Sequence, residues 1–460
     1  MLGSSRLIFV ALLVVYVAVG IWTTRRVSAT GDEPYYFMAA DSLLHGEGFD
    51  LTNRYEALTR SSYAPADPIS EQEFLRSSAP SRVRGGSYPL HDLATSLIIA
   101  LPLALGGRGL VVVIIAAAMA AAVALGHRCA RALGASPLGA SAASLAVGLA
   151  APALTYSGQV FADSLAPLAF ALAIAALFRV VPRGALGVAV ALLVLLHLRF
   201  WPLALALLAV ELAQGPRSWR AFGSLIAPLS AAVAGLALLD LVVYGLPLPH
   251  AGFVLFFTDR PGAQVTGYTR MPLEGLAGML VDRSFGLIPA APLAALVFVG
   301  AGRLLRDPRS RLLVALPIPY LLLVSALDWT GGFNPQARYF VVLAPLFVVL
   351  TAAALAWRPA LVLAIPLGVW TLGQSAVYAL APWLRYDSYG IPPLADQAWS
   401  RFVRLTPGAL FPLFGSDGAT PALAIVWTAS LVGLVLAGWW SPGSRAAVMP
   451  VSRSRDRMTT

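Results

Sequence analysis

The chain alternates apolar segments with short polar connections from one end to the other. Twelve segments are predominantly apolar: 7–22, 109–126, 138–155, 160–180, 184–198, 200–214, 219–244, 286–304, 311–327, 338–357, 359–381 and 421–440. Three longer polar stretches interrupt them, at 23–108, 245–285 and 382–420. Because a crossing helix needs about 20 apolar residues, this pattern predicts an all-α polytopic membrane protein with about 12 transmembrane helices, in a range of about 11 to 13.

One apolar piece inside the first polar stretch, 92–105, is ambiguous because its 14 residues fall short of a full crossing. If it lies at the interface, twelve spans place both chain ends and the short arginine-rich connections in the cytoplasm. That side then holds half of the 32 basic residues and only three acids, Glu211, Asp307 and Asp456. A crossing by 92–105 would reverse most of this, so the positive-inside rule favours twelve spans with interfacial helices at 33–44 and 92–105.

The same assignment places the acid-rich stretches 23–108, 245–285 and 382–420 on the extracytoplasmic face, and the basic tail 441–460 in the cytoplasm. ATP and nucleotide sugars are scarce on the extracytoplasmic face. An enzyme with its site there needs an energised donor that the membrane itself delivers.

Composition narrows the class further. The 460 residues are 58% apolar and 12% charged, with a mean hydropathy of +0.76. The formal charge of +10 comes from arginines between apolar segments, which favours bilayer orientation over nucleic-acid binding. One cysteine, Cys129, excludes an internal disulfide and a cysteine-based metal site. Rossmann, P-loop and zinc-helix motifs and internal repeats are absent from the sequence, which indicates one membrane domain over 1–460.

Two adjacent carboxylates follow the first apolar segment, in Thr30-Gly31-Asp32-Glu33-Pro34-Tyr35-Tyr36. Asp32 suits an N-cap and Pro34 suits a first turn, so one interpretation is a well-capped surface helix. The other is that Asp32 or Glu33 is a catalytic base facing a substrate held in the membrane. The local spacing fits both interpretations.

Two more segments place a charge at the start of an apolar helix. Asp163, after Tyr156-Ser157-Gly158-Gln159, is either another helix cap or a functional carboxylate. Arg338 follows a glycine- and proline-rich turn, and it either snorkels to the interface or presents its guanidinium to a phosphate. Arg199 interrupts an apolar stretch, so we expect it to line a cavity or to lie at the membrane boundary.

Other polar residues are weaker candidates. Arg270 and Arg283, in the 245–285 stretch, are further phosphate ligands or plain surface charges. His91, in Ser87-Tyr88-Pro89-Leu90-His91, and His250 bind a substrate or a metal, or are simply solvated.

The motif Gly31-Asp32-Glu33-Pro34-Tyr35-Tyr36 resembles the signature of GT-C integral-membrane glycosyltransferases, in the protein O-mannosyltransferase and lipid A aminoarabinose transferase branch. Pro89, Asp163, Arg338 and Pro345 follow in an order that is similar to that branch. The sequence departs from it in having Ser87-Tyr88 where the aminoarabinose transferases carry Glu-Lys before the proline of the first loop. A lysine for the donor phosphate is therefore missing there, and arginines have to replace it.

The resemblance implies a GT-C-like enzyme that moves a sugar, with inversion, from a polyprenyl-phosphate donor to a hydroxyl of a glycan, lipid or protein acceptor. Asp32 is then the general base, and Glu33 and Asp163 orient the acceptor or Asp32. Arg338, with Arg283 or Arg270, binds the donor phosphate.

Tyr35, Tyr36, His91 and His250 contribute other substrate contacts in this scheme. A divalent metal ion held by some of Asp32, Glu33, Asp163, His91 and His250 stays open. Two alternatives remain: a transporter or lipid flippase, and a non-catalytic membrane subunit. The side assignment predicts an inner-membrane protein with an extracytoplasmic site.

Overall fold

The computed structural model is almost entirely helical. It describes residues 2–52, 54, 78–214, 219–258, 272–308, 310–326, 334–385, 399, 407–414 and 421–441. Within these residues the β-structure is one antiparallel pair, β1 (Ser78–Pro80) and β2 (Ser87–Pro89), in which Ala79 lies opposite Tyr88. Everything that could cross a membrane is therefore helical, as a hydrocarbon environment requires of an open chain.

Six helices in the described part of the chain are long and apolar enough to cross a bilayer. These six helices correspond to α1 (Leu2–Thr24), α5 (Leu93–Ala132), α11 (Trp219–Tyr244), η3 with α18 (Arg338–Leu343 and Ala344–Leu355), α19 (Arg358–Leu380) and α21 (Pro421–Trp440).

Shorter helices fill the remaining predicted segments. They are α6 (Pro137–Gly148), α7 (Ala151–Tyr156), α8 (Ala162–Leu177), α9 (Gly184–Leu196), α10 (Trp201–Gln214), α14 (Leu287–Ala290), η2 (Pro292–Ala294), α15 (Ala295–Leu305), α16 (Arg311–Ala315) and α17 (Ile318–Ala326). Each of the twelve apolar segments is helical, so the prediction of an all-α polytopic membrane protein is confirmed. Prolines divide several segments because each removes a helix hydrogen bond.

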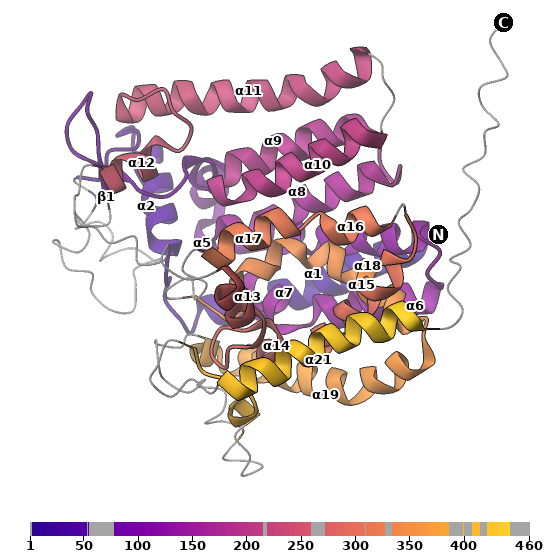
Figure 1. Ribbon diagram of the computed structural model, residues 1–460. Helices are drawn as coiled ribbons and strands as arrows, with labels where there is room; N and C mark the ends of the chain where they lie inside the picture. Colours follow the sequence, from indigo (N-terminus) through magenta and orange to yellow (C-terminus); the bar gives the residue numbers. More distant parts are fainter. Residues whose placement is uncertain are drawn as a thin grey trace, which may run out of the picture.

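The connecting elements are short. They are α2 (Glu33–Leu44), η1 (Leu198–Phe200), α12 (Ala251–Thr258), α13 (Pro272–Val281), η4 (Pro382–Arg385) and η5 (Pro407–Leu410). Figure 1 shows the long helices running side by side, with α2, β1 and α12 gathered at one end of them and the N-terminus at the other. We call the end that carries α2 the site end.

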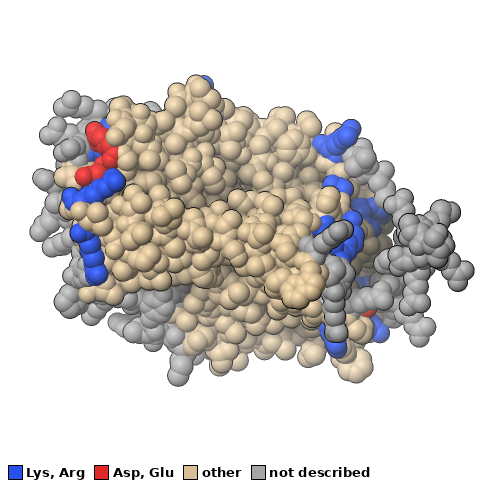
Figure 2. Space-filling view, turned by 90° about the horizontal axis from the view of Figure 1, so that it is seen from above, with Lys and Arg blue, Asp and Glu red and all other residues tan. Residues whose placement is uncertain are grey.

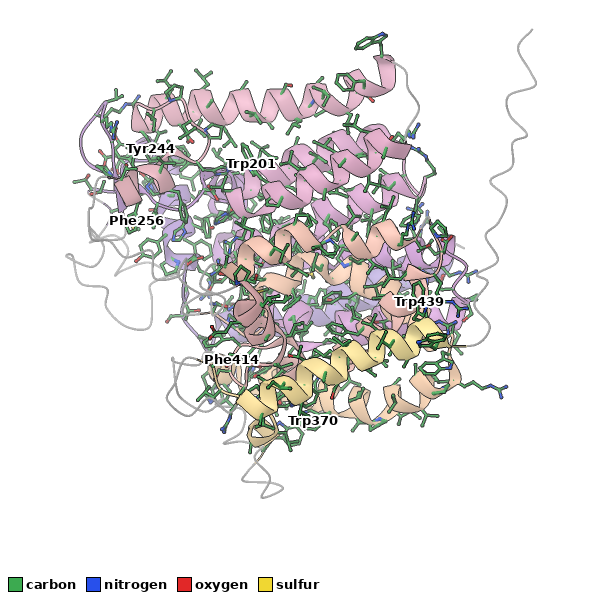
Figure 3. The ribbon with its side chains drawn as sticks, in the orientation of Figure 1. Trp201, Tyr244, Phe256, Trp370, Phe414 and Trp439 are labelled. Carbon is green, nitrogen blue, oxygen red and sulfur yellow. The ribbon has the colours of Figure 1, made fainter. Side chains whose placement is uncertain are left out.

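Charge is sorted along the same direction. Figure 2 shows a broad belt without charged side chains, with arginines at both ends and the clearest group of acidic side chains at the site end. Aromatic side chains mark both ends, since Tyr244 lies toward the site end and Trp439 toward the other (Figure 3). An apolar belt with polar margins is the surface that a bilayer requires.

The end opposite the site is held by arginines from the connections that the sequence grouped together. Arg128 donates to the carbonyl of Val180, and Arg303 donates to the hydroxyl of Ser441 at 2.6 Å. The grouping of these connections at one end agrees with the arginine count. Which end faces the cytoplasm stays a prediction.

Close helix packing depends on glycines. A Cβ on Gly300 of α15 would lie 1.9 Å from the carbonyl oxygen of Leu350 in α18, and one on Gly302 would lie 1.9 Å from that of Val435 in α21. Small residues allow such backbone approach where lipid supplies no hydrophobic drive between helices.

The piece 92–105 is the first leg of α5. Gly106 and Gly107 leave helical geometry, and Gly107 has a φ of 59°, so the helix bends there before continuing to Ala132. The bend brings Arg108 beneath the first loop, where its Nη1 donates to the carbonyl of Val27 at 3.1 Å.

Candidate functional site

Asp32 stands at the N-cap position of α2, but its side chain makes no capping hydrogen bond. Its Oδ2 instead accepts from Nη2 of Arg338 at 2.5 Å, across 306 positions of sequence. Gly31, with a φ of 58°, makes the turn that aims Asp32 at this partner. The interpretation of Asp32 as an ordinary cap on a surface helix is therefore wrong, since most of α2 is buried and the carboxylate is used elsewhere.

Glu33 stabilises the loop that precedes α2. It is 1% exposed, its Oε2 accepts from the amide of Thr30 at 3.1 Å, and its Oε1 accepts from the amide of Val160 at 2.8 Å. Arg108 lies 3.7 Å from the same carboxylate. Glu33 thereby joins α2, α5 and the turn before α8, while Asp32 keeps 23% of its side chain exposed.

Asp163 lies in the first turn of α8 with a side chain only 1% exposed. The N-cap of that helix is Phe161, so the capping interpretation of Asp163 is wrong. Its Oδ2 accepts from Nε of Arg338 at 2.9 Å and lies 3.5 Å from Nη2 of Arg199. Arg199 comes from η1, the break between α9 and α10, and it is buried in this cluster. The sequence predicted that Arg199 lines a cavity or lies at the membrane boundary. In the structure, Arg199 lies in a buried ion pair with Asp163.

Arg338 begins η3 and is only 6% exposed. Ala337 before it has a φ of 59°, unusual for a residue with a Cβ, and its amide donates to the carbonyl of Phe285 at 2.9 Å. The guanidinium lies 4.6 Å from the ring centroid of Phe161. Arg338 is thus fixed between two carboxylates and an aromatic face, and the snorkelling interpretation is wrong.

His91 and the two tyrosines line the other side of Asp32. His91 Nε2 lies 3.9 Å from Asp32 Oδ1, and its ring centroid lies 5.5 Å from that of Tyr35 and 5.4 Å from that of Tyr36. Burial lowers the pKa of His91, with Arg338 adding to that effect against Asp32. His91 is therefore neutral at pH 7, and its contact with Asp32 is a dipole near a charge.

His250 belongs to a neighbouring cluster. Its Nδ1 hydrogen bonds to Asp92 Oδ1, and Asp92 Oδ2 lies 3.3 Å from Nδ1 of His197. The sequence pointed to His250 but not to Asp92 or His197. An aspartate at an N-cap position before α5 gives no local sign of a histidine 158 positions away.

The remaining predicted phosphate ligands are Arg283 and Arg270. Arg283 follows α13, and its amide donates to the carbonyl of Pro412 at 2.8 Å. Phe285, two residues after Arg283, accepts the amide of Ala337. Arg270 lies outside the described residues. Among those described, His, Cys, Asp and Glu side chains form no group of three arranged to hold a metal ion. The three candidate carboxylates, Asp32, Glu33 and Asp163, lie beside arginines. His91 lies near Asp32, and His250 hydrogen bonds to Asp92.

The charges alternate through the site as Arg199, Asp163, Arg338 and Asp32. Burial raises the pKa of Asp32, but the charge of Arg338, together with its hydrogen bond, lowers the pKa to about 2. Asp32 is therefore ionised, and it is a weak base while Arg338 holds it.

An apolar pocket with about 430 Å³ of empty space adjoins the residues that follow Arg338. Its walls come from α6, α7, α14, η2, η3 and α18, and they include Ala150, Leu287, Phe340, Val341, Ala344 and Phe347. This volume includes the open mouth of the pocket. Arg338 is not among the lining residues, but Phe340, two positions later, is.

Comparison with known proteins gives a fold-level similarity. Neither the models of protein families nor the curated proteins contain a match to the sequence. Among solved structures the chain is similar to ArnT from Cupriavidus metallidurans bound to undecaprenyl phosphate, with 15% sequence identity and a TM-score of 0.44. The similarity covers 94% of this chain and 76% of that chain, and it defines no residue-by-residue correspondence.

Proposed function

We propose that this protein is an integral-membrane glycosyltransferase that moves a sugar from a polyprenyl phosphate to an acceptor hydroxyl. One observation carries the proposal: a partly exposed carboxylate, Asp32, lies within hydrogen-bond distance of a buried guanidinium, Arg338. The residues that follow this cation in η3, Phe340 and Val341, line an apolar pocket inside a membrane-type bundle. A base, a phosphate ligand and a lipid cavity are the three parts that such a transfer needs.

The reaction is a direct displacement. Asp32 takes the proton of the acceptor hydroxyl while that oxygen attacks the anomeric carbon of the donor sugar. The bond from that carbon to the phosphate oxygen breaks, and the electron pair leaves with the polyprenyl phosphate. One displacement inverts the configuration at the anomeric carbon. Arg338, with Arg199 behind Asp163, stabilises the charge that develops on the phosphate in a site of low dielectric.

Donor binding also activates the base. Arg338 has one guanidinium to share between Asp32 and an incoming phosphate. A phosphate that draws Nη2 away removes the main influence that lowers the pKa of Asp32, so burial then raises the basicity of that carboxylate. Asp163 keeps Nε of Arg338 in place during this exchange, because its contact is with a different nitrogen from the one that Asp32 holds. The lipid donor therefore binds before the acceptor loses its proton.

Glu33 and Asp163 are positioning residues in this scheme. Glu33 has no face left for a substrate, since both oxygens accept backbone amides. Asp163 fixes two arginines at once. We assign the site end to the extracytoplasmic face of the inner membrane, on the arginine distribution. A donor that carries its own leaving group in a lipid suits a face where nucleotide sugars are scarce.

The test is transfer by the purified full chain in liposomes that contain a panel of polyprenyl-phosphate-linked monosaccharides. Asp32→Asn should lower the release of free polyprenyl phosphate at least about 100-fold. The matched control is Asp41→Asn, at a partly exposed aspartate on the same helix that pairs with Arg54. Movement of intact lipid-linked sugar across the bilayer, with no release of polyprenyl phosphate, would show a flippase instead.

A further inference from the structure

A second, polar pocket adjoins the proposed base through His91. It has about 220 Å³ of empty space, open mouth included, and its polar walls are His91, Asp92, Asp240, Tyr244 and His250. These come from the turn before α5, the C-terminal part of α11 and the turn before α12. The phosphate-binding arginines Arg199 and Arg338 are not among its walls.

His250 is held in this pocket as a cation. Its Nδ1 contacts Asp92 Oδ1 and its Nε2 contacts the carbonyl of Val194 at 3.2 Å. Both partners are acceptors, so both ring nitrogens must carry a proton. Burial lowers the pKa of His250, but the charge and hydrogen bond of Asp92, with the charge of Asp240 and the Val194 carbonyl, together outweigh it and the net shift is upward. The backbone is fixed as well, with a φ of 65° at His250.

Among the fully buried polar side-chain atoms of the described residues that line this pocket, the second oxygen of Asp92 is the one without a hydrogen-bond partner. Tyr244 donates to the carbonyl of Pro89 at 2.7 Å, and Asp240 accepts from the amide of Ala251 at 2.9 Å. Asp92 Oδ2 is buried, and no described residue donates to it. A buried carboxylate oxygen without a donor is costly, so it indicates a group that arrives from outside.

The nearest nitrogen cannot supply that proton. His197 Nδ1 lies 3.3 Å from Asp92 Oδ2 but already accepts the amide proton of Arg199 at 3.2 Å. The lone pair of Nδ1 is directed at the Arg199 amide, so this nitrogen carries no proton to donate to Asp92 Oδ2.

A proton donor lies near the same histidine, since the ring centroid of Tyr36 is 5.4 Å from that of His91. The hydroxyl of Tyr36 is buried, and no described residue accepts from it. Burial raises the pKa of Tyr36, so it stays a protonated phenol. A hydroxyl donor and a carboxylate acceptor around one histidine suit a ligand that both accepts and donates, as each sugar hydroxyl does.

We propose that Asp92, fixed by His250, is a recognition site for one sugar hydroxyl, which donates its proton to Oδ2. This inference rests on the proposed glycosyl transfer and adds a specificity determinant to it. The pocket is narrow, so it takes a hydroxyl or hydroxymethyl arm and leaves the ring outside. Its carboxylates repel phosphate, whereas the arginines attract it, so the two sites orient a glycosyl phosphate in one direction. The hydroxyl belongs either to the donor sugar or to the acceptor glycan.

Binding to the purified full chain distinguishes these sources. The probes are farnesyl phosphate without a sugar, farnesyl-phosphoryl hexoses, and the same hexoses with one hydroxyl removed at a time. The variants are Asp92→Asn and the control Asp41→Asn. If the donor sugar occupies the pocket, Asp92→Asn weakens binding of the hexose-bearing lipids about 10- to 100-fold and leaves farnesyl phosphate unchanged. One deoxy analogue shows the same loss with the wild-type chain, which does not depend on how the variant folds.

If the acceptor occupies the pocket, donor binding is unchanged and the acceptor KM rises by a similar factor. Unchanged donor binding, unchanged acceptor KM and no sensitive deoxy position would overturn the assignment of Asp92. Failure of the wild-type chain to bind farnesyl phosphate at all would overturn the proposed function, and the hydroxyl site with it.

Discussion

Replacing Arg338 with Gln tests whether the alternating charges act as one unit. Two arginines, Arg199 and Arg338, face two carboxylates, Asp32 and Asp163, and the variant leaves one cation for two anions. Removing one partner of a buried ion pair costs about 3–5 kcal/mol of unfolding free energy. Asp163 keeps its contact with Arg199, so Asp32 bears most of this cost, and water at its 23% exposed side chain recovers part of it.

A second substitution separates stability from catalysis. Adding Asp32→Asn removes the carboxylate that Arg338→Gln leaves without its arginine and keeps the Arg199–Asp163 pair, so we expect about half or more of the lost unfolding free energy to return. Transfer stays about 10²- to 10³-fold low in both variants, because the group that stabilises the leaving phosphate is absent. Unfolding in detergent micelles and transfer from a lipid-linked donor are measured on the same preparations. Recovery of transfer together with stability, or wild-type transfer by Arg338→Gln alone, would refute the reasoning.

Three further predictions concern the frame of the site. The lowered pKa of Asp32 contributes about 2 kcal/mol of stability, which is present above about pH 4 and is lost as pH falls toward 2. Acid unfolding of the wild-type chain should show this loss of stability, and acid unfolding of Asp32→Asn should not. Glu33→Gln should lower stability by about 1–3 kcal/mol and reduce kcat more than donor affinity, since the change weakens bonds that orient Asp32; equal effects on both would contradict a positioning role. Gly300→Ala should destabilise by about 1–3 kcal/mol or more through its clash with Leu350, whereas Gly223→Ala, with open space around it, should raise or preserve the melting temperature.

The helices were predictable because the cause is local. Runs of apolar residues in lipid must bury their backbone hydrogen bonds within the segment, and only a helix does so. The sorting of connections into two ends followed from the arginines, and contacts such as Arg303 with Ser441 place those connections together. The breaks at prolines and the bend at Gly106 and Gly107 changed the lengths but not the number of segments.

The site was predictable in its residues but not in its contacts. A carboxylate before a helix caps it or binds something else with the same oxygens, so the sequence around Asp32 and Asp163 left both alternatives open. The contact with Arg338, which lies 306 and 175 positions away, decided between them. Arg199 carried a signal, since a charge inside an apolar stretch requires a partner. Asp92 and His197 carried none, because their significance comes from tertiary neighbours.

The central claim is that Asp32 removes a proton while Arg338 receives the phosphate of a lipid-linked sugar. The measurement that tests it most directly is a single-turnover assay of polyprenyl phosphate release with acceptor present. It compares the purified wild-type chain with Asp32→Asn. The account predicts rapid release by the wild-type chain and a rate at least about 100-fold lower in the variant, with donor binding retained. Equal rates in the two, or release by neither, would contradict it.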